Sequence, residues 1–194
     1  MNTELEQLFR LHKGYLTRED IPRRGLYYKL LELVNTGEVT RLKPGVFCLD
    51  SEVMDRSMID VGKIVPGGIL CLYSAWTYYE LTTQIPQSFH IAVDKSSKVT
   101  LPNYPPITLY YWEKKYWELG IQDKQIEDIQ VKIYDLEKSV CDALRYRTKI
   151  GIEVSSEILR NYLRRKDRNL SLLMRYASLM RIATVLKKYL EIQL

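Results

Sequence analysis

The most informative stretch of the sequence is Arg23–Leu49, which reads RRGLYYKLLELVNTGEVTRLKPGVFCL. Its first half carries leucine and valine at helical spacing, which predicts a helix over about Arg23–Asn35 that is stopped at Gly37. After this glycine come two short runs typical of strands, Val39–Leu42 and Val46–Leu49, separated by a Lys-Pro-Gly turn. The stretch therefore predicts a helix followed by a β-hairpin.

Two shorter helices are predicted upstream of this stretch. Residues Thr3–His12 place apolar side chains at roughly helical spacing. Thr17 is followed three residues later by Asp20, which resembles a capping box and predicts a one-turn helix ending before Pro22. Three helices followed by a hairpin is the order of a winged helix-turn-helix, and we expect this domain to span residues 1–50.

A winged helix can bind DNA by laying its third helix in the major groove, about 12 Å wide, while the hairpin reaches neighbouring phosphates. Basic and aromatic residues gather at the start of the predicted third helix and around the hairpin turn. The expected DNA-binding residues are Arg23, Arg24, Tyr27, Tyr28, Lys29, Arg41 and Lys43. Arginine could read guanine edges, whereas lysine would mainly position the backbone. The alternative is a winged helix used only for protein contacts, with its arginines in solvent.

The charge of the chain is unevenly distributed. The 194 residues carry a net charge of +5, with 46% hydrophobic and 27% charged residues, a composition typical of globular proteins. Residues 1–49 have a net charge of +2, residues 50–144 of −5 and residues 145–194 of +8. This asymmetry predicts a basic C-terminal surface made by Arg145, Arg147, Arg160, Arg164, Arg165, Lys166 and Arg168. It would bind DNA, RNA or a nucleotide, unless these cations only complement helix C-termini.

Short motifs along nearly the whole chain, in the same order, resemble those of the AbiEi-type antitoxins of abortive-infection systems. They lie at Gly14–Thr17, Leu30–Val34, Gly37–Phe47, Ser74–Thr83 with Ile85-Pro86, Tyr134–Asp142, Tyr162–Lys166 and Arg175–Ala177. The resemblance implies that the winged helix binds and represses the promoter of an antitoxin–toxin operon. It further implies that the second domain helps to counteract a nucleotidyltransferase-like toxin, without a stable complex with it.

Residues 51–194 are predicted to form a mixed α/β domain, in which a small sheet is followed by helices. Strands are expected at Ser88–Val93, Ile107–Trp112, Trp117–Ile121 and Val131–Tyr134. Helices are expected at Ser51–Val65, Leu136–Lys149, from a cap at Ser155 or Ser156 to Arg165, Leu170–Ser178 and Leu179–Ile192. Periodicity leaves Leu70–Leu81 open between strand and helix, and the resemblance favours a helix. The overall fold class is thus α+β, with a winged helix-turn-helix, a mixed α/β domain and a helical C-terminal tail.

The sequence predicts a binding protein with no catalytic residues, no metal site and no cofactor. Cys48, Cys71 and Cys141 are odd in number and form no CxxC pair, which indicates reduced, buried thiols of a cytoplasmic protein. Asp135 and Glu137 are interpreted as an N-cap and a first-turn acid of a helix rather than as a nuclease pair. No run approaches the ~20 apolar residues of a membrane span, and no secretory signal is recognised.

Several further points remain open at the level of the sequence. Asp142 is expected to pair with Arg145 or Arg147. A dense aromatic set could stack bases, although its spacing favours a core position: Tyr73, Tyr78, Tyr79, Tyr110, Tyr111, Trp112, Tyr116 and Trp117. One alternative function is a winged-helix transcription factor with no toxin partner, whose second domain senses a ligand or dimerises. Another is an unrecognised nucleic-acid enzyme. Both a monomer and a dimer are compatible with the sequence.

Overall fold

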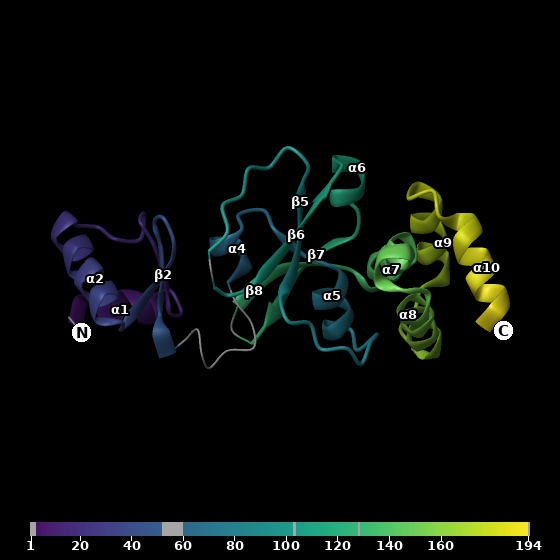
Figure 1. Cartoon of the computed structure of the whole chain (residues 1–194), viewed down its shortest axis with the longest axis horizontal. Coiled ribbons are helices and arrows are strands. Elements are labelled where there is room, and N and C mark those ends of the chain that lie inside the picture. The colour runs from purple at the N-terminus through teal and green to yellow at the C-terminus, as the bar shows by residue number, and fades with distance from the viewer. Residues whose placement is uncertain (1–2, 52–59, 103, 128, 194) are drawn as a thin grey trace. The chain divides into compact units, whose positions relative to one another are not determined.

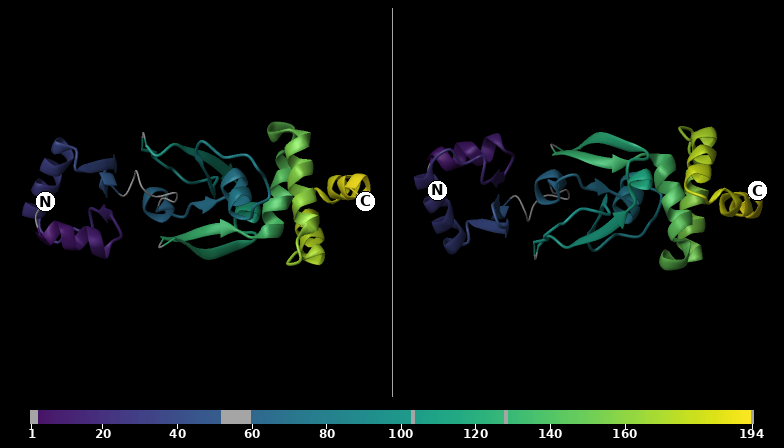
Figure 2. Two further views of the ribbon diagram at one scale, coloured as in Figure 1. Left: turned by 90° about the horizontal axis from the view of Figure 1, so that it is seen from below. Right: turned by 90° about the horizontal axis from the view of Figure 1, so that it is seen from above.

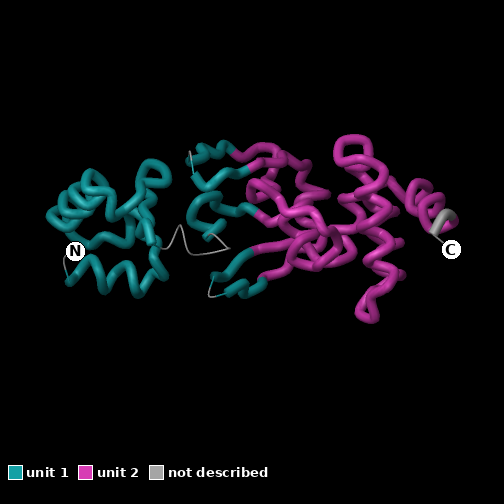
Figure 3. The backbone as a smooth tube through the Cα atoms, turned by 60° about the horizontal axis from the view of Figure 1, so that its bottom comes forward, with its two compact units in different colours: residues 1–68, 98–107, 124–131 teal, residues 69–97, 108–123, 132–194 magenta. Residues whose placement is uncertain are grey.

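The computed structural model describes residues 3–51, 60–102, 104–127 and 129–193 (Figure 1). The fold is α+β, and the chain divides into two compact units (Figure 3). Unit 1 comprises residues 1–68, 98–107 and 124–131, and unit 2 comprises residues 69–97, 108–123 and 132–194. The predicted domain boundary at residue 50 adjoins residues 52–59, which lie outside the described residues, so that boundary stays a prediction.

The N-terminal part of unit 1 contains two helices and three short strands. Their bounds are α1 (Thr3–Leu11), β1 (Tyr15–Thr17), α2 (Arg24–Thr36), β2 (Val39–Lys43) and β3 (Val46–Leu49). The strands form an antiparallel sheet in the order β1-β3-β2. The apolar faces of α1 and α2 pack on this sheet through Leu5, Phe9, Leu30 and Phe47, each with no exposed surface. The helix and hairpin predicted from Arg23–Leu49 are therefore present.

The end of α2 has the geometry that the sequence indicates. Gly37 adopts a left-handed conformation with φ of 79°. Its N–H donates to the Val34 carbonyl (3.3 Å), and the Glu38 N–H donates to the Leu33 carbonyl (3.0 Å). This is the Schellman arrangement, which a glycine adopts without the strain that a Cβ atom would cause.

The predicted one-turn helix after Thr17 is wrong. Tyr15–Thr17 instead pairs with β3, and Arg18 extends this edge by donating its backbone N–H to the Gly45 carbonyl (2.8 Å). The Thr17 N–H still donates to Asp20 Oδ2 (2.7 Å), as in a capping box. Because the backbone of Thr17 belongs to a strand and Pro22 follows closely, these bonds close a single turn and not a helix.

The larger sheet has five strands in the order β6-β5-β4-β8-β7. Their bounds are β4 (Ile69–Leu70), β5 (Phe89–Asp94), β6 (Ile107–Trp112), β7 (Ile121–Ile126) and β8 (Ile129–Tyr134). The central strand β4 pairs antiparallel with β5 and parallel with β8. The strands predicted near residues 88–93, 107–112 and 131–134 are thus confirmed.

The strand predicted at Trp117–Ile121 is wrong. Lys114–Trp117 form the short helix α6, and β7 begins only at Ile121. Gly120, with φ of 72°, turns the chain between them, and the Gly120 carbonyl accepts the N–H of Asp135 (2.7 Å). Trp117 therefore ends a helical turn and does not begin a strand.

The remaining helices are α4 (Val61–Ile64), α5 (Leu72–Tyr78), α7 (Leu136–Ile150), α8 (Ile152–Arg164), α9 (Leu170–Leu179) and α10 (Ala183–Gln193). Asp135 caps α7 by accepting the Lys138 N–H (2.7 Å), as predicted. Asn169 caps α9 by accepting the Leu172 N–H (3.0 Å), whereas the sequence left Asn169 and Ser171 as alternatives. Most of the helix predicted at Ser51–Val65 falls on residues outside the described part. The helix predicted at Leu70–Leu81 is shorter than expected, because Ile69–Leu70 form β4.

Two predicted helix starts are wrong. The helix α8 begins directly after Gly151, and neither Ser155 nor Ser156 caps it. Ser155 is buried within α8 and donates its hydroxyl to the Ala143 carbonyl of α7 (3.1 Å). The last helix begins at Ala183 and not at Leu179, because Arg181 takes a left-handed φ of 59° between α9 and α10.

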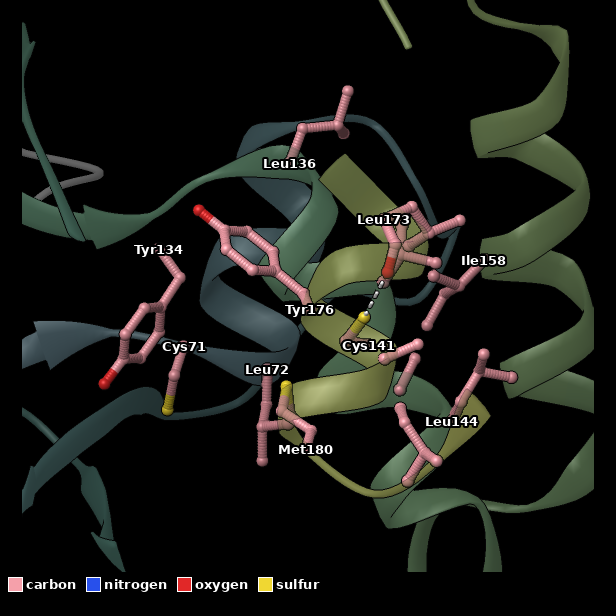
Figure 4. Packing of buried hydrophobic residues seen from close by; sticks show 14 of the residues in the cluster. Cys71, Leu72, Tyr134, Leu136, Cys141, Leu144, Ile158, Leu173, Tyr176 and Met180 are labelled. Atoms are coloured by element: carbon pink, nitrogen blue, oxygen red, sulfur yellow. Dashed lines mark hydrogen bonds between the residues drawn. The ribbon is translucent and has the colours of Figure 1, made fainter. Parts of the chain in front are cut away.

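The helix α7 is the centre of unit 2. It contacts α5, α8, α9 and α10, and Figure 2 shows α7 and α8 side by side at the end of the sheet. Every residue from Leu136 to Leu144 is buried. In Figure 4 Cys141 and Leu144 of α7 lie among Ile158, Leu173 and Met180 of the surrounding helices. The three cysteines are buried thiols, as predicted.

Candidate nucleic-acid interface and a buried polar centre

The start of α2 presents basic and aromatic side chains to solvent. Arg23, Arg24, Tyr28 and Lys29 are all exposed, and Tyr28 retains 53% of its surface. The Arg24 guanidinium lies 5.9 Å from the centroid of the Tyr28 ring. Four of the seven predicted DNA-binding residues therefore occupy the first turns of one helix, where they can reach a common ligand.

A second set of side chains joins α2 to the hairpin. The Arg18 guanidinium lies 4.6 Å above the ring of Tyr27, and that ring meets Phe47 edge to face with centroids 6.0 Å apart. On the hairpin, the Arg41 guanidinium lies 6.0 Å from the Phe47 ring. Two arginines and two aromatic rings, from the turn after β1 and from α2, β2 and β3, thus form one continuous row of contacts.

We call Arg18, Arg24 and Arg41 and the rings beneath them the stacked-arginine surface. Within the part of the chain that the structure describes, none of the three guanidinium groups forms an ion pair with a carboxylate. Stacking on a ring orients a guanidinium by cation–π attraction while its N–H groups stay available in the plane. The surface is therefore oriented and positively charged, with donor groups that the protein leaves unused.

Two predicted residues have structural contacts. Tyr27 is half-buried between Arg18 and Phe47. Lys43 is partly buried and donates its Nζ to the Ile64 carbonyl (2.5 Å), and this burial lowers the pKa of its ammonium group. Local sequence pattern does not single out Arg18, because its place beside Tyr27 and Gly45 depends on the pairing of β1 with β3.

The predicted basic C-terminal residues lie at two separate places. Arg145 and Arg147 are on the second half of α7. Arg160 and Arg164 are on the last turns of α8, which runs back along α7, and Arg165, Lys166 and Arg168 follow α8. The Asn169 N–H donates to Glu137 Oε1 at the start of α7 (2.8 Å), which places this second group near that end. At 1.5 Å per helical residue, Arg145 is about 15 Å along the axis from Asp135.

Some of these cations already have partners. Arg147 donates to the Leu144 carbonyl (3.0 Å). Arg165 binds Asp167 through two hydrogen bonds (2.9 and 2.8 Å) and donates to the Tyr79 carbonyl (2.8 Å). Arg164, Lys166 and Arg168 are exposed, as is Arg160. The C-terminal charge is therefore divided between structural contacts and solvent.

A buried ion pair occupies the first half of α7. Lys138 and Asp142 have exposed fractions of 0% and 1%, and the Lys138 Nζ lies 2.7 Å from Asp142 Oδ1 and 2.8 Å from Oδ2. The same Nζ is 4.2 Å from the centroids of the Trp112 and Tyr134 rings. Burial raises the pKa of Asp142 to about 6, against the opposing effect of Lys138. The predicted pairing of Asp142 with Arg145 or Arg147 is wrong, because Lys138 lies one turn earlier on the inner face.

The acids at the start of α7 have structural contacts. Asp135 Oδ2 accepts the Tyr176 hydroxyl (2.8 Å), and Glu137 Oε1 accepts the Tyr162 hydroxyl (3.1 Å) in addition to the Asn169 N–H. These bonds tie α7 to α8 and α9, in keeping with the interpretation of Asp135 as an N-cap. Among the described residues, no group of three or more His, Cys, Asp or Glu side chains is arranged to hold a metal ion.

The aromatic set contributes mainly to the core. Trp112 and Tyr116 are buried in the core of unit 2, and Tyr73, Tyr79, Tyr110 and Trp117 pack against it. Tyr78 and Tyr111 keep 39% and 49% of their surface. His90 shares a hydrogen bond with Tyr110 (Nδ1 to Oη, 2.8 Å), and its burial lowers the pKa of the imidazole to about 4. The ring is therefore neutral at pH 7.

The N-terminal domain, with two helices, a short strand, a hairpin and an exposed basic helix start, is consistent with the helix-turn-helix class. A family model described as "Transcriptional regulator, AbiEi antitoxin" matches residues 4–49, which confirms the resemblance for this domain. The family consists of antitoxins that act as transcriptional regulators. No curated protein matches the chain. Among the described residues, no helix combines the length and the hydrophobicity required to cross a membrane.

Proposed function

We propose that this protein represses its own operon by binding the promoter through α2 and the β2–β3 hairpin. The observation that carries this proposal is the stacked-arginine surface. An α-helix with its side chains is about 10–12 Å across and fits the major groove. With α2 in the groove, Arg24, Tyr28 and Lys29 face base edges and phosphates, while Arg18 and Arg41 reach the flanking backbone.

The distribution of charge favours DNA over a protein partner. Exposed cations without a carboxylate partner among the described residues suit phosphate, which accepts several charge-assisted hydrogen bonds at once. Arg23 directly precedes α2, so its side chain is near a helix N-terminus, a position that also favours phosphate. We propose Arg18 as an additional contact and give Lys43 a lesser role, since its ammonium group already binds the Ile64 carbonyl.

We further propose that the protein counteracts a nucleotidyltransferase-like toxin encoded beside it, without forming a stable complex. The family match supports an antitoxin in general, and the motifs of the second domain, which resemble those of the AbiEi-type antitoxins, support this more specific role. Antitoxicity is assigned to residues 51–194. The mechanism is binding and not catalysis, consistent with the structural roles of Asp135 and Glu137.

Binding to the promoter is tested by fluorescence anisotropy with labelled DNA from upstream of the protein's own reading frame. We expect Arg23→Ala with Arg24→Ala, and separately Arg18→Ala, to weaken binding, each contact costing about 1–3 kcal/mol if it reads a base. Five exposed cations lie at the proposed interface: Arg18, Arg23, Arg24, Lys29 and Arg41. If each neutralises one phosphate, log K falls with log salt at a slope of about −4 to −5, and each lost contact reduces that slope by about 1.

The matched control is Arg10→Ala, which removes an exposed arginine from α1 in the same domain. Unchanged affinity and salt slope in both the Arg18 and the Arg23/Arg24 variants would refute the assigned surface. The antitoxin role is tested by co-expressing the full chain with the neighbouring toxin candidate. Failure of the full chain to restore growth would reject that role and leave promoter binding intact.

A further inference from the structure

Unit 2 contains a cavity of about 160 Å³ where the end of β6 and the helix α6 face α7. Trp112 and Tyr111 come from β6, Tyr116 from α6, and Asp142 and Arg145 from α7, while Lys95 follows β5. Cavities that enclose drug-sized ligands are about 300–1,000 Å³, so this one has room for the planar group of a ligand, while the rest of that ligand would lie in its opening.

The walls of the cavity are aromatic. The Tyr116 ring lies 4.0 Å below the Arg145 guanidinium, and the side chain of Tyr111 is half exposed beside it. Trp112 is held in place, since its Nε1 donates to the Tyr146 hydroxyl (2.7 Å). Trp112 and Tyr116 are buried and form the inner wall, whereas the half-exposed ring of Tyr111 provides a stacking surface beside the open space. A stacked base contributes about 1–3 kcal/mol to binding.

The charges around the cavity are not balanced. The charge of Asp142, at the inner end, is neutralised by Lys138. The charge of Glu113, at the rim, is neutralised by Lys115, whose Nζ lies 3.0 Å from Glu113 Oε2. Arg145 and Lys95 form no ion pair with a carboxylate among the described residues. The opening therefore carries two positive charges beside aromatic walls, an arrangement that suits a phosphate attached to a planar ring.

The buried Lys138–Asp142 pair provides hydrogen-bond acceptors at the inner end of the cavity. Each Asp142 oxygen accepts one hydrogen bond from Lys138 and keeps a second lone pair for another donor. A base with an exocyclic amino group has such a donor at the end remote from its phosphate. From its inner end to its opening, the cavity thus presents first a hydrogen-bond acceptor, then aromatic walls and finally two cations.

We propose that this cavity binds a nucleoside monophosphate, with the base against the aromatic wall beside Tyr111 and the phosphate at Arg145 and Lys95. The site is separate from the stacked-arginine surface and is independent of promoter binding. It would give the second domain of a DNA-binding protein a means to respond to a small metabolite.

The test is isothermal titration calorimetry of the full chain with AMP, GMP, CMP and UMP, compared with adenosine and with inorganic phosphate. We expect at least one nucleotide to bind with Kd below about 1 mM, and both adenosine and phosphate to bind at least about tenfold more weakly. Arg145→Gln and Lys95→Ala should each weaken nucleotide binding by about tenfold. Lys98→Ala, which removes an exposed lysine three residues further along the chain, should leave it unchanged.

Three outcomes would overturn the proposal. The first is that none of the four nucleotides binds saturably, and the second is that nucleotide and inorganic phosphate bind equally well. The third is that nucleotide affinity is unaltered in both the Arg145 and the Lys95 variants. Thermal unfolding of each variant, measured without ligand, separates a lost contact from a lost fold. If Arg145→Gln unfolds, Lys95→Ala decides alone, because Lys95 is exposed on the surface.

Discussion

Replacing Lys138 by methionine should destabilise unit 2 strongly, because it leaves the Asp142 carboxylate buried without a cation. The Lys138 Nζ contacts both oxygens of Asp142 at 2.7 and 2.8 Å, and neither side chain is accessible to solvent. Methionine has a similar length and packs well against aromatic rings, so contacts with Trp112 and Tyr134 are largely retained. The variant therefore isolates the loss of the charge.

Breaking one partner of a buried ion pair costs about 3–5 kcal/mol. For a chain of this size each kcal/mol lowers the melting temperature by about 2–4 °C, so we expect a decrease of about 6–20 °C. Replacing both partners, with Lys138→Met and Asp142→Leu together, should cost less than either change alone, because no uncompensated charge remains. The double-mutant cycle then gives a coupling energy of several kcal/mol.

The assay is urea unfolding followed by tryptophan fluorescence, supported by calorimetry. Lys132 and Asp123 provide a matched control, since their Nζ–Oδ1 distance is also 2.8 Å but their side chains are 49% and 73% exposed. Lys132→Met should cost at most about 1 kcal/mol. If Lys138→Met is no more destabilising than Lys132→Met, or if the two buried substitutions are simply additive, the reasoning about the buried pair is refuted.

Two further predictions concern single positions. Gly120→Ala should destabilise the protein more than Gly37→Ala. Both positions have a positive φ, but a Cβ atom at Gly120 would lie 2.8 Å from Lys138 Cβ, whereas a Cβ atom at Gly37 would meet nothing within 4 Å. Equal melting temperatures for the two variants would contradict this. For His90, the folded pKa of about 4 lies below the usual value of about 6.5. The unfolded state therefore binds the proton first as the pH falls, and the free energy of unfolding decreases from pH 6.5 towards 4. His90→Gln should reduce this pH dependence, measured as urea midpoints at pH 7.5, 6 and 5, and an unchanged dependence would exclude His90 as its source.

Local patterns were sufficient for elements with strong end signals. The helix α2 ends at Gly37, and α7 and α9 begin after the caps Asp135 and Asn169, because these signals act over three or four residues. Patterns failed where a distant partner decided the conformation. The bonds of a capping box form at Thr17, yet pairing with β3 keeps that residue in a strand.

The candidate sites show the same division. The sequence by itself determined a basic, aromatic start to α2 and the similarity of the N-terminal domain to the AbiEi antitoxin family, since both depend on residues that are neighbours along the chain. Only the tertiary structure brought Arg18 over Tyr27 and paired Asp142 with Lys138 rather than Arg145. It also divided the basic C-terminal residues between the second half of α7 and the end of α8. Periodicity specifies which face of an element is apolar, but strand pairing and helix packing decide which charged groups meet across those faces.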